Sequence, residues 1–156
     1  MNSTTLRRGV GVVAASALAL TLAGCSLFGG APRDDSGQLT AAASLALSDL
    51  QPGDCIDDVN ALPESVTRVP AVSCSTTHNG EVFAVTTTGA TYLQSVAESF
   101  CLEAFTTYIG KDYEPSSLDV VYFSPPNAAA KDKTLTCIAY HKDGATDNTS
   151  LKGSKQ

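Results

Sequence analysis

The stretch that decides the fold is Cys74-Ser75-Thr76-Thr77-His78-Asn79-Gly80-Glu81-Val82, which places a cysteine, a histidine and a carboxylate around an Asn-Gly pair. Asn-Gly is typical of a two-residue β-hairpin turn, because both residues tolerate positive φ. In such a hairpin His78 and Glu81 flank the turn and face one another across the two strands. We therefore predict that His78 and Glu81 form a structural polar pair.

A catalytic use of this stretch is the alternative interpretation. His78-Asn79-Gly80-Glu81 matches part of a His-x-x-Glu-His metalloprotease motif, but Val82 stands where the second histidine belongs. Ser75 lies near His78, yet no Gly-x-Ser-x-Gly nucleophile elbow surrounds it. We predict no catalytic residue, no metal and no cofactor. An extracytoplasmic enzyme, metal-dependent or hydrolytic and using His78 and Glu81, stays open as the second function.

Four cysteines follow the N-terminal region, and their even number in a small exported domain indicates two disulfides. Spacing alone permits three pairings of Cys55, Cys74, Cys101 and Cys137. The pairing we predict is Cys55–Cys74 and Cys101–Cys137, because each pair joins segments that we expect to be neighbours in the fold. Each closed loop would contribute roughly 3–4 kcal/mol. A four-cysteine zinc site needs close pairs such as Cys-x₂-Cys, which this sequence lacks.

The first 24 residues are predicted to be a lipoprotein signal peptide. Arg7 and Arg8 precede an apolar run over residues 9–20, which is shorter than the roughly 20 residues of a membrane-spanning helix. Leu22-Ala23-Gly24-Cys25 resembles the bacterial lipobox. That resemblance implies cleavage before Cys25 and a diacylglyceryl group on its sulfur. We expect a protein anchored by lipid to the cell membrane and facing the extracytoplasmic side.

The charge of the chain argues against nucleic acid as a partner. The signal removes two of the ten basic residues and none of the sixteen acidic ones, so the rest carries 8 − 16 = −8. A surface of this sign repels phosphate backbones and anionic lipid headgroups. Attachment to the membrane is therefore expected through the acyl chains on Cys25.

The chain divides into an ordered centre between two polar ends. Residues 25–49 are predicted to be a flexible linker with a short marginal helix over residues 39–50, and residues 142–156 a disordered polar tail. Residues 50–141 are predicted to fold as one small domain. The acidic residues that open this domain, among them Asp54 and Asp57, are expected in a solvated loop rather than a calcium site.

The pattern inside the domain predicts an α+β fold, a small antiparallel sheet packed against one main helix. Apolar residues at three- and four-residue steps predict a helix over residues 91–109, with Thr91 as N-cap and Gly110 following its end. Runs rich in β-branched and aromatic residues predict strands at 66–73, 81–88, 118–123 and 134–140, after a short opening strand near Cys55.

Several of these residues recur together in one known family. They are Gly53-Asp54-Cys55, Val72-Ser73-Cys74 followed by His78 and Glu81-Val82-Phe83, Cys101 in a helix ending at Tyr108-Ile109-Gly110, and Leu135-Thr136-Cys137. In this order, over residues 50–141, the chain resembles the septum-formation family of actinobacterial exported proteins. It departs from that family at residues 128–133 and in having no tryptophan. The resemblance implies a link to cell division or envelope assembly, and hence an envelope or division protein as the partner. It does not imply a known catalytic activity, so we carry over no catalytic residue from it.

Overall fold

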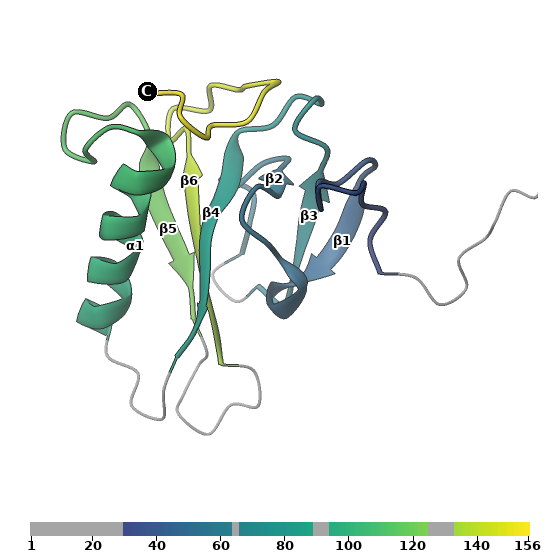
Figure 1. Cartoon of the computed structure of the whole chain (residues 1–156), viewed down its shortest axis with the longest axis horizontal. Helices are drawn as coiled ribbons and strands as arrows, with labels where there is room; N and C mark the ends of the chain where they lie inside the picture. Colours follow the sequence, from purple (N-terminus) through teal and green to yellow (C-terminus); the bar gives the residue numbers. More distant parts are fainter. Residues whose placement is uncertain (1–29, 64–65, 89–93, 125–132) are drawn as a thin grey trace, which may run out of the picture.

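A computed structural model describes residues 30–63, 66–88, 94–124 and 133–156, and Figure 1 shows the arrangement of their elements. Within these residues the predicted α+β fold is confirmed, with one α-helix and one antiparallel sheet of six strands. The elements in chain order are β1 (Ala43–Ala46), the 3-10 turn η1 (Leu47–Asp49), β2 (Cys55–Ile56), β3 (Arg68–Val72), β4 (Gly80–Thr87), α1 (Gln94–Ile109), β5 (Asp119–Phe123) and β6 (Thr134–Tyr140).

The sheet has the strand order β1-β3-β2-β4-β6-β5, and α1 packs on the half formed by β4, β6 and β5 (Figure 1). Each face has its own core, because successive side chains of a strand point to opposite faces. Val82 and Ile138 belong to the core away from the helix, whereas Phe83 and Ala84 both join the core under α1. A register shift between Val82 and Ala84 allows two consecutive residues to face the helix.

The predicted apolar stripe of the helix is confirmed at its centre. Every fourth residue of α1 is buried, namely Ala97, Cys101, Phe105 and Ile109. Val96, which the periodicity placed in the stripe, is instead 61% exposed. Gly110 has φ +80 and donates its N–H to the Thr106 carbonyl at 3.0 Å, so it ends the helix as predicted. The proposed N-cap, Thr91, lies outside the described residues.

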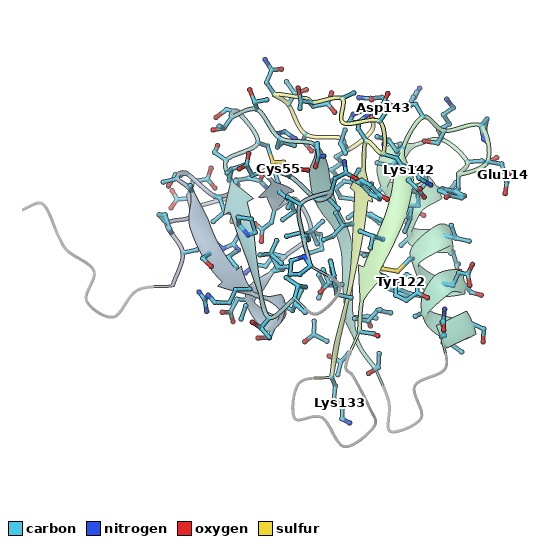
Figure 2. All side chains as sticks on the ribbon, turned by 180° about the vertical axis from the view of Figure 1, so that it is seen from behind. Cys55, Glu114, Tyr122, Lys133, Lys142 and Asp143 are labelled. Carbon is cyan, nitrogen blue, oxygen red and sulfur yellow. A yellow bond between two sulfur atoms is a disulfide. The ribbon has the colours of Figure 1, made fainter. Side chains whose placement is uncertain are left out.

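Both predicted disulfides are confirmed, and Figure 2 shows them as yellow bonds, one beside the label of Cys55 and one between the sheet and α1. Cys101–Cys137 joins α1 to β6, with the two Cα atoms 5.7 Å apart. Cys55–Cys74 joins β2 to the turn after β3, with the Cα atoms 5.2 Å apart. Each bond therefore fixes one half of the curled sheet.

The prediction of a flexible linker is wrong for residues 30–49. This segment supplies the edge strand β1, although a marginal helix was predicted over residues 39–50. β1 pairs with β3 from Ala43↔Ala71 to Ala46↔Arg68. Leu39 and Leu45 are buried in the core away from α1. The segment is ordered because it covers apolar side chains of the sheet that would otherwise face water.

The prediction of a disordered tail is also wrong. Residues 142–156 run across the end of the sheet near β4 and β6, where Figure 1 shows them in yellow. Leu151 is 1% exposed and belongs to the core under α1. The domain therefore extends from residue 30 to residue 156 among the described residues, beyond the predicted bounds of 50 and 141 on both sides.

Candidate functional site

The stretch from Cys74 to Val82 does not form the predicted two-residue hairpin. Gly80 is the first residue of β4 and pairs with Ile56 on one side and Tyr140 on the other. A Cβ at Gly80 would lie 2.4 Å from a Val59 methyl group, so the close packing of neighbours requires glycine here. The Asn-Gly signal was therefore misread as a turn.

Asn79 binds two separate segments instead of turning the chain. Its side-chain oxygen accepts the Val59 N–H at 2.7 Å, and its amide donates to the Asp58 carboxylate at 3.1 Å. Its backbone carbonyl accepts the His141 N–H at 2.9 Å. Asn79 is 4% exposed, so these bonds replace the water that a buried amide would lose.

His78 is 1% exposed and contributes to the same end of the sheet. Its backbone forms an antiparallel bridge with Asp147, with N···O distances of 3.0 and 2.8 Å. Its Nδ1 lies 2.7 Å from the Thr76 carbonyl oxygen, which only accepts, so Nδ1 carries the donated proton. Nε2 is buried without a hydrogen-bond partner among the described residues.

Glu81 is fully buried in β4 and takes different partners from those of His78. Its carboxylate accepts hydrogen bonds from the Tyr108 hydroxyl at 2.5 Å, from the Ser150 hydroxyl at 2.7 Å and from the Leu151 backbone N–H. The prediction of a His78–Glu81 pair is therefore wrong, because both residues lie at the entry to β4 rather than across a turn from one another. Burial, and next the Glu81 carboxylate, raise the pKa of Tyr108 above its ordinary value.

The C-terminal residues that meet Glu81 were missed by the sequence analysis. Ser150 and Leu151 bind the carboxylate, while the N–H groups of Gly153 and Lys155 donate to the carbonyls of Tyr108 and Ile109 at 2.8 and 3.0 Å. These carbonyls belong to the last turn of α1 and have no partner within the helix. We call residues 150–155 the C-terminal clasp. Leu151, the one large apolar residue in the polar run 142–156, was the signal that could have revealed it.

Two side-chain contacts hold the segments that flank the sheet. Asp54 is 1% exposed, and the Arg33 guanidinium binds both of its oxygens at 2.6 and 2.8 Å, so the expectation of a solvated loop is wrong for Asp54. The hydrogen bond to Asp54 is the main cause that raises the pKa of Arg33. His141 Nε2 lies 2.6 Å from an Asp147 oxygen and so connects the residue after β6 to the segment before the clasp.

Among the described residues, one group of cysteine, histidine and carboxylate side chains has the spacing of metal ligands. The sulfurs of Cys55 and Cys74 and a Glu81 oxygen lie within 4.8 Å of one another. The two sulfurs are bonded to each other, and the Glu81 carboxylate accepts three hydrogen bonds. Cysteine binds a metal ion as a thiolate, so Cys55 and Cys74 cannot serve as ligands while the disulfide is intact.

A groove with a volume of about 540 Å³ lies where α1 meets β4 and the clasp. Its size is within the range of small-molecule sites, about 300–1,000 Å³. Lys152 Nζ lies 5.8 Å from the centre of the Tyr108 ring, within the distance of a cation–π contact. The lining residues are Phe83, Phe100, Glu103, Ala104, Thr107, Tyr108 and Lys152. Aromatic rings and two opposite charges thus meet on one face of the domain.

The remaining predicted site, Cys25, lies outside the described residues. Comparison with known proteins finds no family model, no curated protein and no solved structure that matches this chain. Among the described residues, no helix has the length and apolar character needed to cross a membrane.

Proposed function

We propose that this protein is a lipoprotein, anchored to the extracytoplasmic side of the cell membrane through Cys25, whose domain is a binding or structural module of the cell envelope. The pairing of the cysteines carries this proposal. The chain has five cysteines, and four of them form Cys55–Cys74 and Cys101–Cys137. Cys25 is the fifth, and it ends the lipobox-like Leu22-Ala23-Gly24-Cys25.

The two disulfides support the compartment. Disulfides persist in exported proteins and are rare in the reducing cytosol. Three of the four bonded cysteines are completely buried, so the bonds are part of the core rather than attachments at its surface. An oxidising location outside the cytoplasm accounts for a domain whose two sheet halves each depend on one disulfide.

The groove beside α1 is the surface that we propose for the partner. Phe100 and Tyr108, which are partly buried, offer aromatic contact area in the groove, and aromatic residues are enriched where proteins bind one another. The net charge of −8 of the anchored chain favours a partner with a complementary basic patch. The resemblance to the septum-formation family supports a protein of envelope assembly or division as this partner.

We propose no catalytic role for His78 or Glu81. His78 is 1% exposed and Glu81 is 0% exposed, so a substrate in solution would not meet either side chain. The carboxylate already accepts bonds from Tyr108, Ser150 and Leu151. These contacts favour the binding or structural interpretation over hydrolysis.

The test is site-specific photo-crosslinking in intact cells. A photoreactive residue at Thr107, in the groove, is expected to capture one discrete partner, whereas the same residue at exposed Thr67, before β3, is not. Ala104→Arg fills the groove and should abolish the crosslink. Val96→Arg, on an exposed position of the same helix, is the matched control and should leave it intact. Equal capture from Thr107 and Thr67, or a crosslink that survives Ala104→Arg, would contradict the proposed surface.

A further inference from the structure

The two disulfides differ in their access to solvent. Cys101 and Cys137 are both 0% exposed and lie in the core between α1 and the sheet. Cys55 is also 0% exposed, but its partner Cys74 is partly exposed. Cys74 begins a turn whose next three residues, 75–77, are all exposed. Among the four bonded cysteines, Cys74 is therefore the one with exposed surface, and an external thiol would approach the folded domain at this residue.

The same disulfide lies beside a buried charge. A carboxylate oxygen of Glu81 and the sulfurs of Cys55 and Cys74 all lie within 4.8 Å of one another. The carboxylate is held in place by the Tyr108 and Ser150 hydroxyls and by the Leu151 N–H. It is therefore a fixed neighbour of both sulfurs and not a mobile surface group.

We propose that Cys55–Cys74 is a thiol–disulfide exchange site, which a dithiol reductant opens by attack on Cys74. The Glu81 carboxylate slows this opening. The proposal concerns the chemistry of this bond and goes beyond the binding function above. It assigns different roles to two bonds that the sequence predicts only as structural disulfides.

The exchange proceeds through a mixed disulfide. A thiolate of the dithiol attacks the Cys74 sulfur, the bond between the two cysteine sulfurs breaks, and its electron pair leaves on the Cys55 sulfur. The second thiol of the reductant then attacks the reductant's first sulfur, which is bonded to Cys74 in the mixed disulfide, and Cys74 is released. The reductant is oxidised to its disulfide, and its two protons end on Cys55 and Cys74. Cys55 is the leaving group because only Cys74 is exposed to the attack.

Glu81 slows this step through like charge. The leaving Cys55 thiolate forms within 4.8 Å of a carboxylate, in a region from which water is excluded. A neighbouring like charge disfavours the thiolate, and a leaving thiol of higher pKa leaves more slowly. Removal of the charge is therefore expected to accelerate opening by about tenfold.

The experiment uses the folded, non-lipidated chain of residues 26–156 and treats it with dithiothreitol without denaturant. Free cysteines are alkylated at intervals and mapped by mass spectrometry. Cys55 and Cys74 should be labelled well before Cys101 and Cys137. A glutathione pulse should leave its adduct on Cys74 and not on Cys55. Release of all four cysteines at one common rate would overturn the proposal, because it would mean that only global unfolding exposes the bonds.

The role of Glu81 is measured by a ratio, the opening rate of Cys55–Cys74 divided by that of Cys101–Cys137 in the same molecule. A general loss of stability accelerates both rates and so cancels in the ratio. Glu81→Gln should raise that ratio about tenfold. Glu81→Met, which also removes the charge, is the second variant if the first does not fold. Tyr108→Phe destabilises the same contact but keeps the carboxylate, so it should leave the ratio within about twofold of the unaltered protein. An unchanged ratio in the uncharged variants would overturn the assigned role of Glu81.

Discussion

The Glu81 carboxylate accepts a 2.5 Å hydrogen bond from the Tyr108 hydroxyl, and so joins the second residue of β4 to the last turn of α1. The same carboxylate binds Ser150 and Leu151, which come about seventy positions later in the chain. Sheet, helix and C-terminal clasp therefore meet at one buried charge. A carboxylate without water needs this full set of donors, so the clasp is part of the folded domain.

Tyr108→Phe should lower the free energy of unfolding by about 1.5–3 kcal/mol, because a hydrogen bond to a charged acceptor is lost while the ring remains. Chemical denaturation monitored by circular dichroism measures the change. Tyr122→Phe is the control, since the Tyr122 hydroxyl makes no side-chain hydrogen bond within the described part of the chain. Equal effects of the two substitutions would contradict the assigned role of the Tyr108–Glu81 bond.

Leu151→Ala should destabilise the domain by about 2–5 kcal/mol, the usual cost of truncating a buried leucine. Leu151 is 1% exposed although it lies only five residues from the end of the sequence. The matched control is Val96→Ala, which changes a 61% exposed side chain and should alter stability by no more than about 0.5 kcal/mol. A melting temperature that Leu151→Ala leaves unchanged would show that the clasp is not part of the core.

Arg33→Ala should cost about 3–5 kcal/mol, because it leaves the buried Asp54 carboxylate without its charged partner. The same substitution in an Asp54→Asn background should cost less than about half as much, since no buried charge is then uncompensated. A double-mutant cycle by urea denaturation measures the coupling. Additive effects would mean that the segment before β1 is not held by this ion pair.

Tyr113 provides a prediction at alkaline pH. Its hydroxyl donates to Asp119 at 2.7 Å, and this bond, followed by burial, raises the pKa of Tyr113 to about 12. The stabilisation is complete below the ordinary tyrosine pKa of about 10 and is lost as the pH rises through about 12. Ultraviolet titration of tyrosinate should show late ionisation, because Tyr108 and Tyr113 both have a raised pKa. Tyr113→Phe should reduce this late ionisation by one tyrosine, and Asp119→Asn should shift the same part of the curve to lower pH. A titration curve that Asp119→Asn does not move would contradict this contact.

Local patterns were sufficient to predict the main elements of the fold. The helix period identified Cys101 and Phe105 as core residues, and β-branched runs identified β4 and β6, because these signals depend on residues a few positions apart. The disulfide pairing followed from the predicted neighbours. These parts of the fold were therefore available from the sequence alone.

The missed parts depend on contacts between distant residues. β1 contains alanine, serine and leucine, without β-branched residues, and becomes a strand because β3 offers it an edge more than twenty residues later. The clasp is ordered by Glu81, far away in the sequence. Gly80 belongs to a turn signature but lies within a strand, where it pairs with Tyr140. Glycine is needed there because Val59 and Tyr140 leave no space for a side chain. In each case tertiary packing overrides the local preference.

The most direct test of the proposed function is the mass of the N-terminal peptide of the mature protein, isolated from the membrane fraction. The proposal predicts a peptide that begins at Cys25 and carries a diacylglyceryl group on its sulfur. It also predicts that Cys25→Ser leaves the protein unprocessed or releases it from the membrane. A mature chain with an unmodified Cys25, or a Cys25→Ser variant that is processed normally and stays on the membrane, would contradict the proposal.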